Sequence, residues 1–265
     1  MAVVLIVVDA PDVELAADAL WQAGPSAVGE EVLPDGRVRL TADVADVAAV
    51  PHPWSVTVLE SDGEAHLDTW RDWARPVRVA ERIVLHPAWL PVEPATGDDL
   101  VVPLDPGRTF GSGSHPSTRL VVAALVAHVH AGDRVLDVGA GSGVLAVVAA
   151  RLGAKSVLAI DVDLAAPEVT LANARTNGVD DLVMASNVPL AEVEGHFDLV
   201  LANIGLRVLG EVAGDLVRLV RPGGLLVLSG LLAAQVDALL EAAYPNVVEV
   251  ERSTEEGWTA CVLRT

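Results

Sequence analysis

The sequence contains very little cysteine and few aromatic residues. Cys261 is its only cysteine, so an intramolecular disulfide and a metal site built from several cysteines are excluded. The seven histidines show no spacing that is typical of metal ligands. We therefore expect no metal site, and we expect Cys261 to be a small buried residue of the last strand.

Long hydrophobic runs are also missing. The apolar run at residues 2–8 has no basic leader and no cleavage site, which favours a buried strand over a signal peptide. No apolar stretch reaches the ~18 residues of a membrane helix without a charge, glycine or proline interrupting it. We expect a soluble, cytoplasmic, monomeric protein that does not associate with membranes.

Basic residues are scarce relative to acidic ones. The chain has 17 Lys and Arg against 37 Asp and Glu, which gives a formal net charge of −20. Because nucleic-acid binding needs a basic face, this balance argues against direct contact with DNA or RNA. It favours a small basic protein as partner, although the same charge also serves solubility alone.

The chain is rich in apolar residues and has room for two domains. A hydrophobic content of 52% with 20% charged residues is typical of a well-packed globular protein of 265 residues. Residues 1–60 follow the order β-α-β-β-α-β, which predicts a small ferredoxin-like α+β domain. Its predicted strands are Ala2–Val8, Ala27–Leu33, Arg37–Thr41 and Trp54–Glu60, and its predicted helices are Pro11–Ala23 and Asp43–Val50.

Residues 61–105 are rich in tryptophan, proline and charge. Prolines at positions 87, 91, 94 and 103 exclude regular helix. Strand-like patterns occur at Val77–Ala80 and Arg82–Leu85. We interpret the segment as a linker that folds back on the domain that follows.

Residues 106–265 alternate between strands and helices. The helices are expected at Ser117–His130, Gly143–Leu152, Ala165–Asn177, Leu206–Val220 and Ala233–Tyr244. The strands are expected at Arg134–Val138, Ser156–Ile160, Leu182–Ala185, Phe197–Ala202, Leu225–Gly230, Val247–Arg252 and Trp258–Arg264. Continuous apolar strands between helices predict a parallel sheet covered on both faces. The connection at 253–257 is too short for a crossover, so the last two strands form an antiparallel hairpin. The predicted fold class is α/β, a doubly wound sheet with the ending expected of a class I methyltransferase.

A glycine-rich turn stands where the first strand of this region meets its helix. The segment DVGAGSG, residues 137–143, contains Gly139, Gly141 and Gly143. Glycine lets the backbone turn tightly against a ligand, and a helix N-terminus offers free N–H groups. Asp161 ends the next strand, where a carboxylate accepts hydrogen bonds from both ribose hydroxyls of an adenosine. The Gly-x-Gly-x-Gly spacing differs from that of nicotinamide enzymes and favours S-adenosylmethionine over NAD.

Two further stretches bear on the methyl acceptor. FDLVLAN, residues 197–203, places Asn203 at the carboxyl end of its strand, where ligands bind in open α/β sheets. The amide oxygen of Asn203 can accept a hydrogen bond from an attacking amine, or the side chain can cap the next helix. Leu104–Thr118 (LDPGRTFGSGSHPST) can close over a cofactor and shape an acceptor channel, or it can be an ordinary interdomain linker.

These motifs together resemble those of one family. LDPGRTFGSGSHPST, RVLDVGAGSGVLAVVAARLGAKSVLAIDVD, FDLVLANI and GGLLVLSGLL look like the ribosomal protein L-eleven methyltransferase family. The resemblance covers residues 70–265, and the Phe-Gly-x-Gly-x-His-Pro-x-Thr loop is its most diagnostic part. It implies a small substrate-recognition domain, a linker and a class I methyltransferase domain that uses S-adenosylmethionine. It also implies a basic ribosomal protein of the large subunit as substrate, methylated on lysine or α-amino groups.

The same resemblance assigns roles to individual residues. The cofactor contacts that it implies are Thr118, Gly139, Asp161 and Asn203, and the other two glycines of the loop, Gly141 and Gly143, are predicted to bind the cofactor with them. The residues it places around the pocket are Phe110, Gly111 and His115. Asn203 is the predicted catalytic residue, and His115 is the one histidine positioned to assist, although it can instead order the loop by a hydrogen bond.

The sequence departs from the family pattern at two places. Residues 203–206 read NIGL and are followed by Arg207, where Asn-Ile-Leu-Ala is usual. Arg108 and Thr109 stand where small or apolar residues are common. These changes leave the cofactor residues intact and bear on the identity of the protein substrate. Either arginine can also be a salt-bridged surface residue.

Methyl transfer from a sulfonium mainly needs alignment and an unprotonated amine. A partly desolvated pocket lowers the pKa of a lysine, and a water chain can take its proton, so no dedicated base is required. Two other functions stay open: a small-molecule N- or O-methyltransferase with the same cofactor site, and a non-catalytic adenosine-binding module. The loop spacing and the terminal hairpin disfavour an NAD-dependent oxidoreductase.

Overall fold

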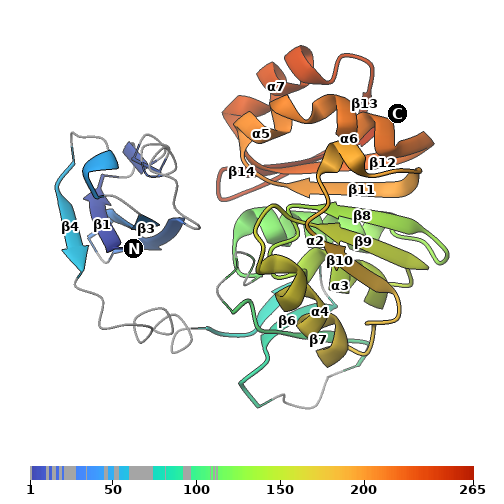
Figure 1. The fold of residues 1–265 in the computed structure, drawn as a ribbon, viewed down its shortest axis with the longest axis horizontal. Coiled ribbons are helices and arrows are strands. Elements are labelled where there is room, and N and C mark those ends of the chain that lie inside the picture. The colour runs from blue at the N-terminus through green and yellow to red at the C-terminus, as the bar shows by residue number, and fades with distance from the viewer. Residues whose placement is uncertain are drawn as a thin grey trace. The chain divides into compact units, whose positions relative to one another are not determined.

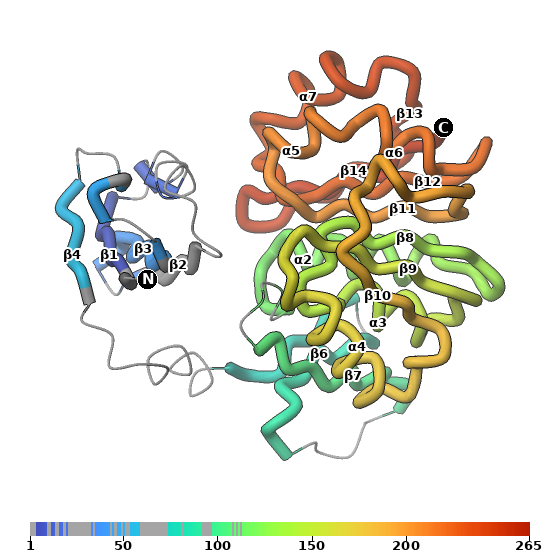
Figure 2. The backbone as a smooth tube through the Cα atoms, in the orientation of Figure 1, coloured from blue at the N-terminus to red at the C-terminus, as the bar shows by residue number. Residues whose placement is uncertain are grey.

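The chain folds into two compact units, Met1–Ala74 and Arg75–Thr265 (Figure 1, Figure 2). The computed structural model describes all residues except 1, 10–11, 14–15, 18–19, 21–27, 34, 45–46, 51–53, 60–73, 81, 92–96, 108, 110 and 112.

The first unit contains a four-stranded antiparallel sheet in the order β2-β3-β1-β4. Its strands are β1 (Ala2–Val8), β2 (Val28–Val32), β3 (Val38–Val44) and β4 (Val56–Leu59). Alternate residues of β1 are fully or almost fully buried, namely Val4, Ile6 and Val8, and they pack in one core with Ala16 and Leu20. This strand order is that of the ferredoxin-like fold predicted from the sequence.

Two helices were predicted in the first unit. The predicted helix Asp43–Val50 was wrong at its start, because β3 continues to Val44, whose backbone pairs with Ala2. Among its described residues, the helical ones form a 3-10 turn, η2 (Val47–Ala49). Most of the predicted helix Pro11–Ala23 lies outside the described residues, and residues 13, 16, 17 and 20 within it are helical.

The second unit is built on a seven-stranded sheet in the order β10-β9-β8-β11-β12-β14-β13. Five strands run parallel: β8 (Arg134–Val138), β9 (Ser156–Ile160), β10 (Val183–Ser186), β11 (Phe197–Asn203) and β12 (Val220–Leu232). The last two, β13 (Val248–Glu255) and β14 (Trp258–Arg264), form an antiparallel hairpin, and β14 joins β12 antiparallel. The order runs outward in both directions from β8 and β11, so the predicted doubly wound sheet is confirmed.

Helices cover both faces of this sheet (Figure 1). One hydrophobic core lies under α2 (Pro116–His128), α3 (Val144–Arg151) and α4 (Ala166–Thr176). The other lies under α5 (Leu206–Glu211), α6 (Ala213–Leu219) and α7 (Val236–Ala243), after the short η6 (Ala233–Gln235). The single helix predicted over Leu206–Val220 was wrong, because the backbone leaves helical geometry at Val212.

A three-stranded sheet completes the second unit. It consists of β5 (Val77–Val79), β6 (Ile83–Pro87) and β7 (Leu100–Leu104). Its buried side chains, among them Ile83, Leu85 and Val102, belong to the same core as α2 and α3. Strand β7 was not predicted, because Pro103 obscured the pattern; as an edge strand, β7 tolerates a proline. Much of the stretch interpreted as a linker thus packs into this unit.

No helix in the described part of the chain is long and apolar enough to cross a bilayer.

Candidate functional site

Three predicted site residues follow positions that pair with one another in neighbouring strands. Val138 of β8 pairs with Ile160 of β9 and with Ala202 of β11. Gly139 directly follows Val138, Asp161 directly follows Ile160, and Asn203 directly follows Ala202. The parallel register therefore lines these three up at the carboxyl edge of the sheet, where the strand order reverses and ligands bind in such folds.

The glycines of the cofactor loop all adopt left-handed backbone conformations. Gly139, Gly141 and Gly143 have φ values of 75°, 53° and 77°. The neighbouring side chains also leave no room for a Cβ atom at two of these positions. A Cβ at Gly139 would overlap the side chain of Ile204, and one at Gly143 would lie 2.6 Å from Cγ2 of Thr170. Both the backbone geometry and the close packing require glycine here.

Asp161 holds the loop from the neighbouring strand. Its Oδ2 accepts a hydrogen bond from the Gly141 N–H at 2.8 Å, and its Oδ1 accepts one from the Asp163 N–H at 2.9 Å. A carboxylate has about four lone-pair sites, so two backbone donors leave capacity for two more. The side chain can therefore organise the loop and still accept hydrogen bonds from a pair of hydroxyls.

Asp137 is a further acidic residue of the loop, and sequence reasoning did not assign it a role. It is fully buried, and its Oδ2 accepts a hydrogen bond from the Ala146 N–H at 3.0 Å. Its Oδ1 has no hydrogen-bond partner among the described residues. Burial raises the pKa of this carboxyl to about 7, the Ala146 hydrogen bond opposes the rise, and the charge of Asp161 adds to it. The unmatched acceptor fits a ligand that brings a positive charge or a donor to the loop.

The side chain of Asn203 lies close to that of Thr118, the last residue of the segment Leu104–Thr118. The Nδ2 of Asn203 lies 3.4 Å from Oγ1 of Thr118, which is 1% exposed in the first turn of α2. The amide N–H₂ is thereby turned toward α2, which leaves the carbonyl oxygen as the acceptor of that side chain. The structure thus brings together the two residues that the motifs placed 85 positions apart.

His115 caps helix α2. Its Nδ1 accepts a hydrogen bond from the Ser117 N–H at 3.3 Å and lies 2.8 Å from Oγ of Ser117. The ring packs edge-on against Trp258, with 4.6 Å between ring centroids. Burial lowers the pKa of His115, and the charge of Arg119 lowers it further. The neutral ring is therefore favoured, and its contacts are those of a residue that orders the loop.

The segment Leu104–Thr118, called the acceptor loop below, is joined to the cofactor loop by a hydrogen bond. Oγ of Ser142 donates a hydrogen bond to the carbonyl of Gly111 at 2.6 Å and accepts one from the Val144 N–H at 3.3 Å. Ser142 therefore both caps α3 and connects the two loops. Phe110 and Arg108, which we predicted to matter here, lie outside the described residues. Arg207 forms an exposed ion pair with Glu211 at 2.7 Å, as a surface residue would.

Two apolar side chains stand unusually exposed beside the carboxylate of Asp161. Val162 is 95% exposed and Leu164 is 83% exposed. Sequence reasoning did not single them out, although apolar residues directly after a ligand-binding carboxylate were a usable signal. If Asp161 binds a ribose as the motif predicts, these side chains offer apolar surface for a flat ring beside it.

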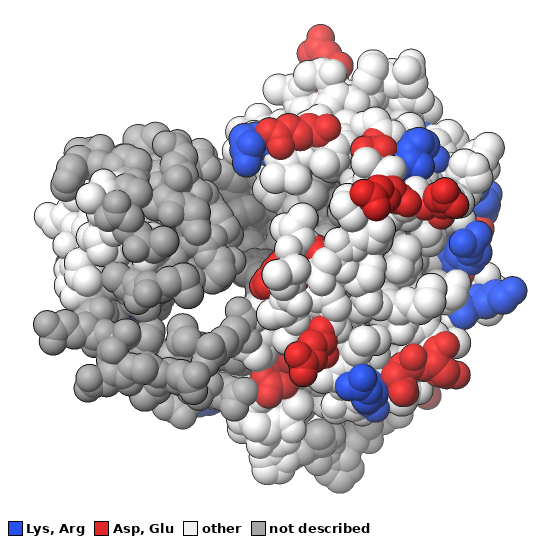
Figure 3. All heavy atoms as spheres, viewed as in Figure 1, with Lys and Arg blue, Asp and Glu red and all other residues white. Residues whose placement is uncertain are grey.

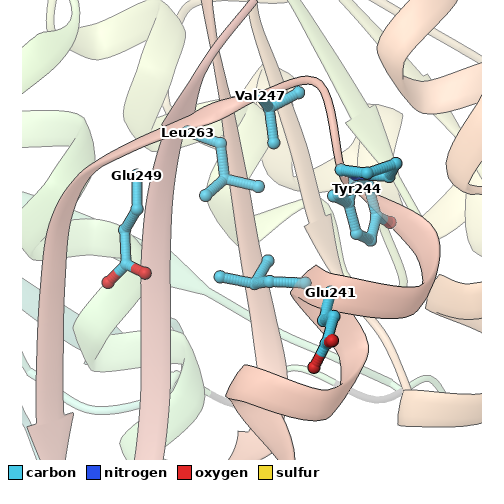
Figure 4. Close-up of a pocket in the computed structure, with 7 residues that line it drawn as sticks. Glu241, Tyr244, Val247, Glu249 and Leu263 are labelled. Carbon is cyan, nitrogen blue, oxygen red and sulfur yellow. The ribbon is translucent and has the colours of Figure 1, made fainter.

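One pocket lies away from these residues, between α7 and the β13–β14 hairpin (Figure 4). It holds about 390 Å³ and is lined by Leu240, Glu241, Tyr244, Pro245, Val247, Glu249 and Leu263. None of the loop residues described above lines it. In the part of the chain that the structure describes, no group of three His, Cys, Asp or Glu residues could hold a metal ion.

Comparison with known proteins identifies the family. The family model described as "Ribosomal protein L11 methyltransferase (PrmA)" matches residues 36–265. The chain belongs to this family. A ribosomal protein L11 methyltransferase of Geobacter metallireducens is 41% identical over 215 residues, which are 81% of this chain and 70% of the relative. One of Citrifermentans bemidjiense is 37% identical over 246 residues, which are 89% of this chain and 79% of the relative.

Solved structures agree with this assignment. The crystal structure of a ribosomal protein L11 methylase from Lactobacillus delbrueckii subsp. bulgaricus matches with a TM-score of 0.67 at 29% identity. The match covers 72% of this chain and 98% of that one. This chain is an S-adenosylmethionine-dependent methyltransferase. The unmatched Oδ1 of Asp137, the spare lone pairs of Asp161 and the tight glycine loop fit that cofactor.

Proposed function

We propose that this enzyme methylates amino groups, lysine side chains and/or the α-amino group, of the large-subunit ribosomal protein L11. The observation that carries the proposal is the position of Asn203. It stands level with Gly139 and Asp161 at the carboxyl edge of the sheet, with its amide nitrogen toward Thr118. A carbonyl acceptor at that place suits an N–H donor, and the names of its relatives specify which protein carries the amine.

The residues of the site would act mainly by positioning. When bound, the cofactor supplies an electrophilic methyl group on a sulfonium that leaves readily. The cofactor loop and Asp161 would hold the adenosine part of the cofactor. Asp137 would accept a hydrogen bond from the charged end of the cofactor. Asn203 would accept a hydrogen bond from the incoming amine and thereby direct the nitrogen lone pair toward the methyl group.

The proton of the amine does not need a dedicated base. Partial desolvation of an ammonium group that enters the site would lower its pKa, so that the proton leaves to water before attack. His115 remains a candidate for assisting this step, because its ring is held in the neutral form beside the loop. Its capping hydrogen bond gives it a second, positioning role.

Recognition of the protein substrate is assigned to the first unit. We propose that the ferredoxin-like sheet of residues 1–60 docks the ribosomal protein, that residues 61–105 connect it while β5–β7 within them pack into the second unit, and that residues 106–265 carry out the transfer. Figure 3 shows acidic side chains next to basic ones in several places on one face of the second unit. The support for a basic substrate is therefore the charge of the whole chain and not one patch: the net charge of −20 attracts a basic protein. We further propose a cytoplasmic monomer that acts without binding nucleic acid.

The test uses labelled S-adenosylmethionine with ribosomal proteins from a strain that lacks this gene. We expect label in one band, the stalk-base protein L11, and no transfer with Asn203→Ala. Label in another protein would overturn the substrate assignment. Tight binding of S-adenosylhomocysteine without label in any protein would favour methylation of a small molecule.

A further inference from the structure

Helix α4 carries a buried polar stripe. Thr170 and Asn173 of α4 and Asn177, its C-cap residue, are spaced i, i+3 and i+7, which places them on one helix face. Their exposures are 1%, 2% and 8%. Polar side chains buried to this degree need hydrogen-bond partners, and the identity of these partners shows what the stripe does.

Asn173 connects two loops of the site. Its Oδ1 accepts a hydrogen bond from the Asp105 N–H at 2.8 Å, and its Nδ2 donates to the Asp105 carbonyl at 2.9 Å. The same Nδ2 donates to the carbonyl of Ser142 at 2.9 Å. Only a primary amide offers one acceptor and two donors in this arrangement, since a carboxylate has no donor and a leucine has neither.

The two residues that Asn173 joins belong to different parts of the site. Asp105 directly follows β7 and opens the acceptor loop, whereas Ser142 lies between two glycines of the cofactor loop. Thr170, one turn earlier on α4, donates from Oγ1 to the carbonyl of Gly141 at 3.2 Å. The polar stripe therefore holds the carbonyl side of the cofactor loop, while Asp161 holds its N–H side.

We propose that Asn173 is a positioning residue for the cofactor, which sets the conformation of the cofactor loop and couples it to the acceptor loop. The proposal rests on the cofactor site proposed above. Without the amide, three hydrogen bonds are lost, two part-buried ones with the backbone of Asp105 and a buried one with the carbonyl of Ser142. Of the hydrogen bonds between described residues, the cofactor loop then keeps only that from Ser142 to the Gly111 carbonyl as its connection to the acceptor loop, and cofactor binding must restore the order that the Asn173 side chain supplied.

Asn177 provides a matched control on the same helix. It is also buried, and its Nδ2 donates to the carbonyl of Pro103 at 2.7 Å and to that of Asn173 at 2.8 Å. It makes none of the hydrogen bonds given for the cofactor loop. Its loss should lower the thermal midpoint as the loss of Asn173 does, because each substitution removes hydrogen bonds from a buried side chain to backbone carbonyls.

The experiment measures the dissociation constant of S-adenosylhomocysteine by calorimetry with the full chain. We expect Asn173→Ala to raise it about tenfold and Asn177→Ala to change it less than about twofold, at similar losses of thermal midpoint. In turnover, Asn173→Ala should raise the KM for S-adenosylmethionine more than it lowers kcat. Asn173→Asp keeps the shape and the acceptor but removes both donors, and it serves as second variant should Asn173→Ala fail to fold.

Two outcomes overturn the inference. One is an Asn173 variant that binds as tightly as the wild type, and the other is an Asn177→Ala variant that weakens binding equally. If Asp161→Ala abolishes binding while Asn173→Ala has no effect, the cofactor site stands and only this inference falls. If the wild type itself does not bind S-adenosylhomocysteine, both fall together.

Discussion

The carboxylate of Asp161 and the backbone amide of Gly141 are joined by a 2.8 Å hydrogen bond between the ends of two neighbouring parallel strands. This contact gives one side chain both a hold on the glycine loop and the acceptors that we propose for the ligand. The loop and the acidic residue therefore form one unit, although 20 positions separate them in sequence.

Replacing Asp161 by alanine should abolish cofactor binding. The variant loses a charged acceptor for the ligand and for the Gly141 amide, and two charge-assisted hydrogen bonds correspond to a loss of about 100-fold or more in affinity. Asp163→Ala is the control, because that carboxylate accepts from the Ala165 N–H outside the loop. Calorimetry with S-adenosylhomocysteine decides the matter: unchanged affinity in Asp161→Ala would refute the site.

Substitution of Gly139 should remove cofactor binding for a steric reason. Alanine there adds a Cβ that overlaps Ile204, in a backbone conformation that alanine disfavours by about 1 kcal/mol. Gly132→Ala has the same left-handed strain at φ 96° but no atom within 4 Å of its Cβ. Both variants should lose some thermal stability, and Gly139→Ala alone should lose binding in a thermal-shift titration with the cofactor. Equal binding by the two variants would contradict the role of close packing.

The sequence predicted the second unit better than the first, for physical reasons. Central parallel strands such as β8 and β9 are short, mostly apolar segments that contain no proline and are followed by glycine or aspartate, and their predicted bounds match the structure. β7 is an edge strand that contains Pro103, so it lacks that pattern. The helix predicted over Leu206–Val220 breaks at Val212, between Gly210 and Gly214, and glycine is a poor helix former whose effect the apolar pattern did not reveal.

The site shows the same division. Gly139, Asp161 and Asn203 end strands, so motif and spacing suffice to predict that they come together. Asn173 and Thr170 lie in the middle of a helix, and only the tertiary structure turns them toward the loops. Asp137 was visible in the motif, but its unmatched oxygen depends on complete burial.

Asp137→Asn should stabilise the protein at high pH and weaken cofactor binding. Burial raises the pKa of Asp137 from 3.8 to about 7, so the folded state binds a proton more tightly than the unfolded state does. Stability contributed by this group is therefore full below pH ~4 and is lost as the pH rises through about 7. The variant should gain on the order of 3 kcal/mol over the wild type at pH 8 and almost nothing at pH 4. Thermal midpoints across this range measure the gain.

A control of opposite sign accompanies that experiment. Partial burial of Asp198 acts to raise its pKa, but hydrogen bonds from the Arg134 amide and the Arg221 guanidinium outweigh it, and the pKa is lowered. Asp198→Asn should therefore lose stability at pH 8 and have little effect at low pH. If both variants changed stability in the same direction with pH, the burial of Asp137 could not be the cause.

Variants of His115 separate loop ordering from proton transfer. His115→Ala removes the acceptor for the Ser117 N–H and should cost about 1 kcal/mol, which is typical for the loss of a helix N-cap. His115→Asn restores an acceptor there, so it should recover stability and keep most of the wild-type kcat if the residue only orders the loop. Because burial lowers the pKa of His115, its stability contribution is present above pH ~6.5 and is lost as the pH falls below it. The stability difference between wild type and His115→Ala should therefore be larger at pH 8 than at pH 5. A collapse of kcat in His115→Asn with normal thermal stability would instead assign the histidine a part in removing the proton of the amine.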